Sequence, residues 1–103
     1  MVIPADTTWA FNALIAARSD ETDGNNSAIY KIEGGLKRDE AGNTAIVGSV
    51  TVTVIAADTD AIPWSVTAEA NDTTEALAIK VTGEAATNIR WTCKLDITQV
   101  GYA

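Results

Sequence analysis

The chain has 103 residues, of which 47% are hydrophobic, and fourteen acidic against seven basic residues give a net charge of −7. This length predicts a single domain spanning residues 1–103. An acidic chain repels phosphate backbones, so no nucleic-acid binding is expected. The apolar runs fall far short of the roughly 20 residues that span a bilayer, so no membrane insertion is expected.

The chain contains no histidine and one cysteine, Cys93. Without histidine it lacks the commonest general base, the imidazole metal ligands and the usual switch near neutral pH. A single cysteine cannot form an internal disulfide. The N-terminus resembles no secretory signal, because it has neither a basic region nor an apolar stretch with a cleavage site. We therefore expect synthesis in the cytoplasm, no enzymatic activity, no metal and no cofactor.

The first predicted strand runs from Thr8 to Arg18. Alternation gives one wholly apolar face, which consists of Trp9, Phe11, Ala13, Ile15 and Ala17. The other face consists of Ala10, Asn12, Leu14, Ala16 and Arg18, which indicates a strand largely covered on both sides. The apolar residues of this segment also fit a helical spacing, so a short helix stays open as an alternative. The polar run 19–27 follows and predicts an exposed loop tip.

The middle of the chain predicts two more strands around a turn. Residues 28–36 read as a strand, and the charged run 37–43 predicts a tight turn. Residues 44–57 form the longest β-branched run, whose face comprises Ile46, Val50, Val52 and Val54. Gly48 interrupts this run, and we expect a bulge or bend there that lets the strand cross between two sheets.

Three further alternating segments, residues 64–68, 77–81 and 88–97, complete the set of predicted strands. Turn signals separate the strands at short intervals, which is typical of antiparallel folds without crossover helices. The predicted fold class is therefore all-β, an antiparallel β-sandwich of jelly-roll-like type with about six to eight strands. The inward face of the last strand is predicted to consist of Ile89, Trp91, Cys93, Leu95 and Ile97.

Cys93 and the tryptophans are the residues that most invite a chemical role. A nucleophilic Cys93 would need a cationic or helix-terminal setting and a base. Because Trp91 and Leu95 lie on the same face, we predict that Cys93 is a small core residue. Trp9, Trp64 and Trp91 could form a platform for sugar stacking. Each lies in phase with apolar neighbours, however, which favours the core.

The remaining candidates are acidic groups and two tyrosines. The loop 20–26 is rich in oxygen ligands but lacks the spacing of a calcium loop, so we predict a solvated loop. Asp58 and Asp60 could form a carboxylate pair for glycoside hydrolysis, but two acidic residues beside a proline-containing turn are common by chance. Tyr30 and Tyr102 are predicted to be surface or intersubunit contacts, and Tyr102 is the better candidate because it lies next to the chain end.

Three stretches in order along the chain carry a family resemblance: YKIEG at 30–34, TAIVGSVT at 44–51, and LAIKVTGEA at 77–85 running into IRW at 89–91. They resemble a domain recurrent in tailed-bacteriophage virion proteins, typically near the C-terminus of tail-fibre and related structural proteins. The matched residues are strand and turn residues and identify no catalytic position. Ser19 replaces a second basic residue of that family, and residues 85–87 replace a loop glycine.

The resemblance implies an architectural or adhesive role in a virion, as a tail fibre, spike or capsid-surface appendage made in the host cytoplasm. It also implies a homo-oligomer, with a trimer favoured, that contacts other virion proteins and host surface glycan. Oligomer contacts would cover the strand edges of a small β domain. The alternative is a carbohydrate-binding module for host surface glycan. Whether the chain is free-standing, internally initiated or a fragment stays open.

Overall fold

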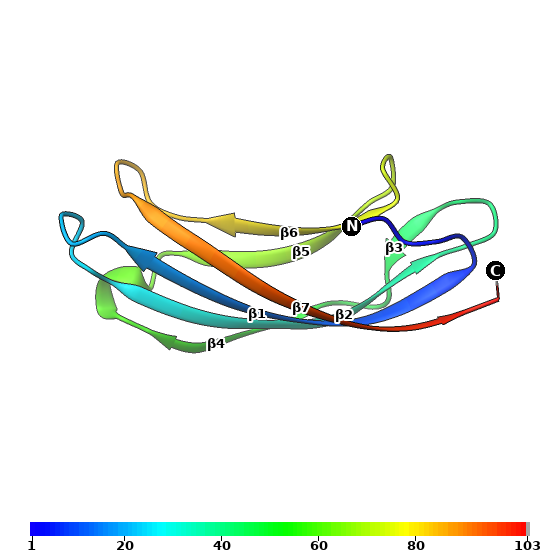
Figure 1. Cartoon of the computed structure of the whole chain (residues 1–103), viewed down its shortest axis with the longest axis horizontal. Coiled ribbons are helices and arrows are strands. Elements are labelled where there is room, and N and C mark those ends of the chain that lie inside the picture. The colour runs from blue at the N-terminus through cyan, green and yellow to red at the C-terminus, as the bar shows by residue number, and fades with distance from the viewer. Residues whose placement is uncertain (103) are drawn as a thin grey trace.

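The computed structural model describes residues 1–102, which form seven strands and one short 3₁₀ turn at Thr59–Ala61 (Figure 1). The strands are β1 (Thr7–Ser19), β2 (Ser27–Arg38), β3 (Thr44–Ile46), β4 (Thr51–Ala57), β5 (Ser65–Asn71), β6 (Ala76–Thr82) and β7 (Ile89–Gly101). The predicted all-β, sandwich-like fold is confirmed. The helical alternative for the first segment is excluded, because that segment is β1. In residues 1–102 no helix is long and apolar enough to cross a membrane.

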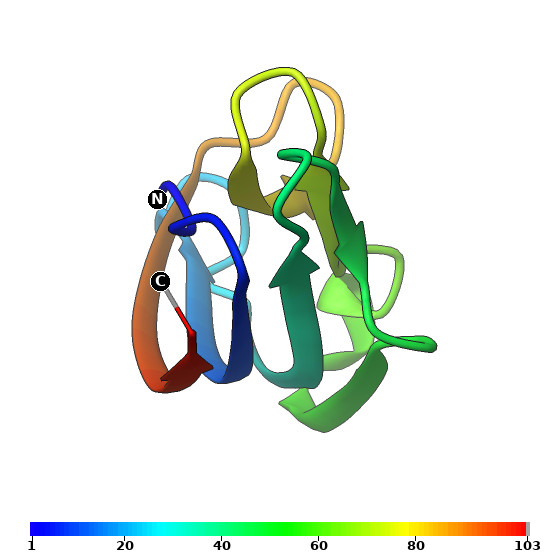
Figure 2. The ribbon, with the colours of Figure 1, turned by 90° about the vertical axis from the view of Figure 1, so that its right-hand side faces the viewer.

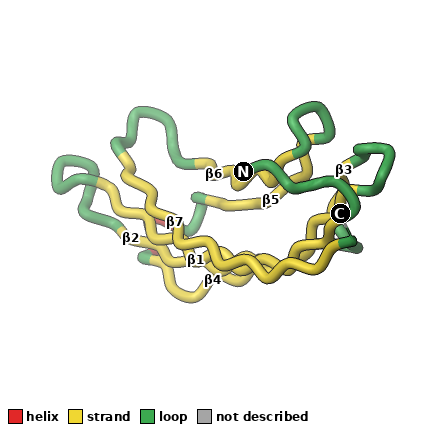
Figure 3. The backbone as a smooth tube through the Cα atoms, turned by 45° about the vertical axis from the view of Figure 1, so that its right-hand side comes forward, coloured by secondary structure: helices red, strands yellow, loops and turns green. Residues whose placement is uncertain are grey.

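The strands form two antiparallel sheets of unequal size (Figure 2). β1 lies inside the larger sheet and pairs along its length with β2 on one side and β7 on the other, so that Ala13 faces both Ile32 and Leu95. β3 and β4 share the far side of β2. The hairpin of β5 and β6 forms the second sheet and lies over one face of the curved larger sheet (Figure 3).

The segment 44–57 is broken where Gly48 predicted a bend. Gly48 has a φ of 64°, a left-handed conformation that favours glycine, and it separates β3 from β4. The prediction that the chain crosses between sheets here is wrong, because β3 and β4 both pair with β2. The N–H of Val47 donates to the carbonyl oxygen of Gly35 at 2.8 Å, which keeps the chain beside β2 through the break.

Only one face of β1 is covered. Its buried side chains alternate strictly with exposed ones, and Leu14 is 47% exposed on the outer face. The prediction that both faces are covered is therefore wrong. The small sheet packs on a single face of the larger sheet, and an antiparallel sheet can leave its other face in water.

All the aromatic residues except Tyr102 lie in the core or pack against it. Trp9 and Trp64 are buried and Trp91 is half-buried, which supports the predicted core role of the tryptophans. The Trp91 ring stacks on the Tyr30 ring at 6.4 Å and lies 6.1 Å from the Trp64 ring. Such aromatic packing favours a fixed arrangement of the two sheets.

The prediction that Tyr30 is a surface or intersubunit contact is wrong. Tyr30 is 2% exposed, and its hydroxyl donates to the carbonyl oxygen of Trp64 at 3.3 Å. Burial raises the pKa of this hydroxyl above its usual value. The physical reason is that β2 is an interior strand, and Tyr30 lies on its inner face in phase with Ala28 and Ile32.

A polar junction joins the two sheets where the loop between β5 and β6 approaches β2. Arg38 Nη1 donates to the carbonyl oxygen of Ile3 at 3.0 Å, and Arg38 Nε lies 3.6 Å from Glu75 Oε2. The Thr44 hydroxyl donates to Glu75, and the Thr44 N–H donates to Asp72 Oδ1 at 2.6 Å. The junction therefore holds the N-terminal segment, β2, β3 and the β5–β6 loop together.

Candidate functional site

Asp20 and Asp58, two of the carboxylates considered as candidate sites, stabilise loops by hydrogen bonds. Asp20 Oδ1 accepts from the N–H of Asp23 at 2.8 Å, and Asp58 Oδ2 accepts from the N–H of Ser27 at 2.8 Å. The 20–26 loop is largely exposed, as predicted. Within residues 1–102, no three Asp, Glu or Cys side chains are grouped so that they could hold a metal ion. These carboxylates therefore have a structural use in the positions where catalysis or calcium binding was considered.

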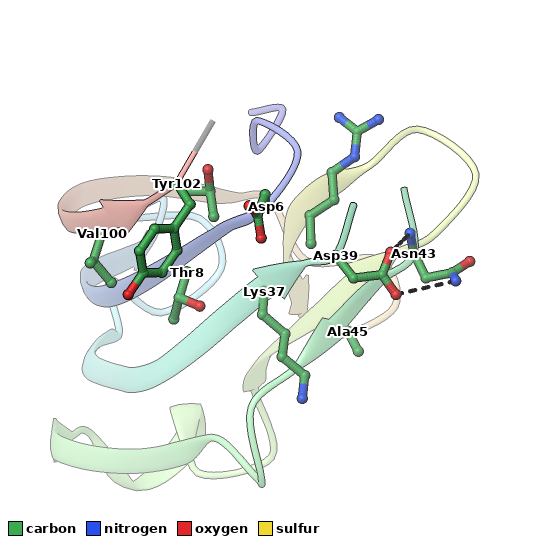
Figure 4. Close-up of a pocket in the computed structure, with 10 residues that line it drawn as sticks. Asp6, Thr8, Lys37, Asp39, Asn43, Ala45, Val100 and Tyr102 are labelled. Atoms are coloured by element: carbon green, nitrogen blue, oxygen red, sulfur yellow. Dashed lines mark hydrogen bonds between the residues drawn. The ribbon is translucent and has the colours of Figure 1, made fainter. Parts of the chain in front are cut away.

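The predicted turn between β2 and β3 is stabilised by Asp39. Its Oδ1 accepts from the N–H of Asn43 at 2.9 Å, and Gly42 has a φ of 92° (Figure 4). The backbone hydrogen bond from Asn43 lowers the pKa of the Asp39 carboxyl below its usual value. The hydrogen bond that stabilises the turn therefore favours the ionised form of the Asp39 carboxyl.

Cys93 faces the side predicted from periodicity, but the prediction that it is a core residue is wrong because it is exposed. β5 lies against β2 and β3, so the small sheet leaves this part of β7 uncovered. Neighbouring side chains still desolvate the sulfur enough to raise the pKa of the thiol. A raised thiol pKa is the opposite of what an activated nucleophile needs.

Cys93 should react with a thiol reagent in the native protein, slowly at neutral pH and faster as the pH rises. Its exposure permits the reaction, and its raised pKa keeps the thiolate fraction small near pH 7. The rate of maleimide labelling between pH 6 and about pH 10 measures this, with the urea-unfolded chain as the control. A titration midpoint below that of the unfolded chain would contradict the expectation.

The larger sheet ends in two open edges, which are the main candidate functional surface. Among the described residues β7 pairs with β1 alone, and β4 pairs with β2 alone. Exposed or half-buried apolar side chains line both strands: Val52, Val54 and Ile55 on β4, and Cys93, Leu95 and Ile97 on β7. Open edges with apolar side chains are templates for pairing with another chain.

A hollow of about 390 Å³ lies at the end of the sheet where β7 finishes. Tyr102 is 90% exposed there, which confirms its predicted surface position, and its N–H donates to the carbonyl oxygen of Asp6 at 3.1 Å. Figure 4 shows the Tyr102 ring between Val100 and Thr8, with Lys37 further along the hollow. A role of Tyr102 in an intersubunit contact stays a prediction.

The three stretches that carry the resemblance to phage virion domains build the core and its connections. The first lies in β2, the second covers β3 and the link to β4, and the third covers β6 and the start of β7. Two of them supply the stacked rings of Tyr30 and Trp91. Comparison with family models, with curated proteins and with solved structures found no match to this chain.

Proposed function

We propose that this chain is a structural domain of a bacteriophage virion, in a tail fibre, spike or capsid-surface appendage, and that it acts by assembly. The observation that carries the proposal is the larger sheet with two open edges and exposed apolar side chains along them. Natural proteins cover or blunt such edges, and homo-oligomer contacts are one way to cover them. Other copies and other virion proteins are the proposed partners, with a trimer favoured.

The virion setting is supported by the resemblance of residues 30–34, 44–51 and 77–91. These residues form strands, turns and a stacked aromatic pair, so the similarity concerns the scaffold. A domain whose shared residues build the scaffold suits an architectural role better than a catalytic one. Its carboxylates at Asp20 and Asp58 are likewise used for loop structure.

Two measurements test this proposal. Light scattering coupled to size exclusion should show a homo-oligomer, and a strictly monomeric species at high concentration would contradict the assembly role. Mass spectrometry of purified phage particles should detect the chain, and labelling with an antibody should place it on the tail or capsid. Its absence from the particles would refute the virion setting.

A second candidate function, recognition of host surface glycan, is favoured by the exposed Tyr102 ring beside the hollow. An aromatic face can stack on the apolar face of a sugar ring, and the polar groups of Asp6, Lys37 and Asn43 line the same hollow (Figure 4).

Tyr102→Ala should weaken binding of host polysaccharide by about tenfold, because loss of one stacked ring costs on the order of 1–2 kcal/mol. Isothermal titration calorimetry is the suitable measurement, since the buried tryptophans are poor reporters of a surface ligand. Tyr102→Phe keeps the ring and serves as the control. Absence of heat with every host fraction would exclude this function.

A further inference from the structure

β7 presents a free backbone edge along its whole length. The carbonyl of Asn88 accepts from Asp20, and the N–H of Tyr102 donates to Asp6, so both even-numbered residues point toward the β1 side. Backbone groups alternate in direction along a strand, and the register between β7 and β1 is unbroken. The odd-numbered residues from Ile89 to Gly101 therefore direct their N–H and C=O groups to the open side.

Neither a proline nor a bulge blunts this edge of β7. The strand has 13 residues, contains no proline and shows no register shift against β1. The other open edge is different, since the register of β4 shifts between Ile29 and Tyr30 and leaves Ile55 without a partner. β4 also lacks charged residues that could select a register. β7 is therefore the better template for a specific pairing.

We propose that two copies of this chain pair antiparallel through β7, about a two-fold axis at Leu95, and so join their larger sheets into one. In this register Leu95 faces Leu95 of the second copy, and Ile89 faces Gly101 of the second copy. Every residue of the strand then has a partner. The inference rests on the proposed assembly function and names a second copy as the partner, and at this edge it commits to a two-fold dimer in place of the trimer that the resemblance favours.

The charges on the outer face of β7 select this register. Lys94 faces Asp96 of the second copy, and the two-fold axis repeats the pair. Registers centred on Lys94 or on Asp96 would place like charges directly opposite each other, which is unfavourable. In one copy the Lys94 and Asp96 side chains are 76% and 68% exposed, so both can contact a second strand. Their charged atoms lie 3.9 Å apart within that copy, but such an exposed pair contributes little and does not prevent the contact.

The inner face of β7 fits the same register. Cys93 would face Ile97 of the second copy, and the two Leu95 side chains would meet. The apolar side chains of β7 would therefore form one continuous row across the two copies. On the outer face Thr92 would face Thr98, a favourable cross-strand pair. A register centred on Cys93 would also oppose Arg90 and Asp96, but it would leave the last residues of β7 without partners.

Charge reversal tests the pairing. Lys94→Asp and Asp96→Lys each convert both cross-strand ion pairs into like-charge pairs, so each should raise the dimer Kd in sedimentation equilibrium at least about tenfold. The double variant Lys94→Asp/Asp96→Lys restores opposite charges and should return the Kd to near the original value. Lys31→Asp is the matched control. Lys31 Nζ lies 3.8 Å from Glu33 Oε1 on the same outer face of the sheet, but in β2, away from the paired β7 strands.

Cysteine cross-linking tests the register. In a Cys93→Ser background, Leu95→Cys should form an intermolecular disulfide on mild oxidation, because a directly opposed pair lies at about 5.5 Å between Cα atoms. Native Cys93 should not cross-link, because the two copies of it would lie about 13 Å apart along the strands. A Cys93 disulfide in the wild-type oligomer would overturn the register.

The outcomes separate this inference from the proposed function. An oligomer, such as a trimer, whose Kd is unchanged by either single reversal would overturn the β7 pairing and leave assembly intact. A wild-type chain that is monomeric at all concentrations would overturn both. Loss of association in the single variants without rescue in the double variant would also overturn the pairing, provided that circular dichroism shows the double variant folded.

Discussion

Replacing Tyr30 with alanine is expected to lower the free energy of unfolding by about 3–5 kcal/mol, the usual cost of removing a large buried aromatic side chain. Tyr30 is 2% exposed, and its ring stacks on Trp91 at 6.4 Å between the two sheets. Truncation leaves a cavity there and removes the hydroxyl that donates to Trp64. Urea denaturation followed by tryptophan fluorescence measures the change.

Two matched variants serve as controls for Tyr30→Ala. Tyr30→Phe keeps the ring and loses only one hydrogen bond, so it should cost about 1 kcal/mol. Tyr102→Ala removes the same side chain from a position that is 90% exposed and should stay within about 0.5 kcal/mol of the original stability. Equal effects of alanine at positions 30 and 102 would show that Tyr30 is not in the core.

Glu75→Gln is expected to lower the free energy of unfolding by about 1.5–3 kcal/mol, the range for hydrogen bonds to a charged group. The Glu75 carboxylate lies 3.6 Å from Arg38 Nε and accepts from the Thr44 hydroxyl, and only 20% of its side chain is exposed. The amide keeps the shape of the side chain but leaves the guanidinium of Arg38, itself 25% exposed, without its counter-charge.

Glu69→Gln provides the control for this second substitution. Glu69 pairs with Lys80 at 3.1 Å, a shorter distance than the one in the junction, but both side chains are about half exposed. Water screens such a pair, so its loss should cost about 0–1 kcal/mol. Chemical denaturation of both variants compares the two sites. If Glu69→Gln cost as much as Glu75→Gln, burial of the junction would not be the source of its stability.

The residues of the candidate surface were only partly predictable from the sequence. Tyr102 is predicted to lie at the surface, and it is 90% exposed. Tyr30 was misassigned, although it is in phase with Ile32, because the sequence does not show that β2 is an interior strand. Cys93 was misassigned for the opposite reason. Its side chain points to the inner face of the larger sheet, but β7 is an edge strand and the small sheet does not bury it there.

The sequence by itself determined that the chain forms strands and which side chains share a face. Both properties follow from a period of two residues, which is local and can be read within β1 or β7 alone. Only the tertiary structure decided which strands lie at the edges, that β3 and β4 stay beside β2, and that the small sheet covers one face of the larger one. These depend on pairing between residues far apart in the chain, such as Ala13 with Leu95, for which local periodicity carries no information.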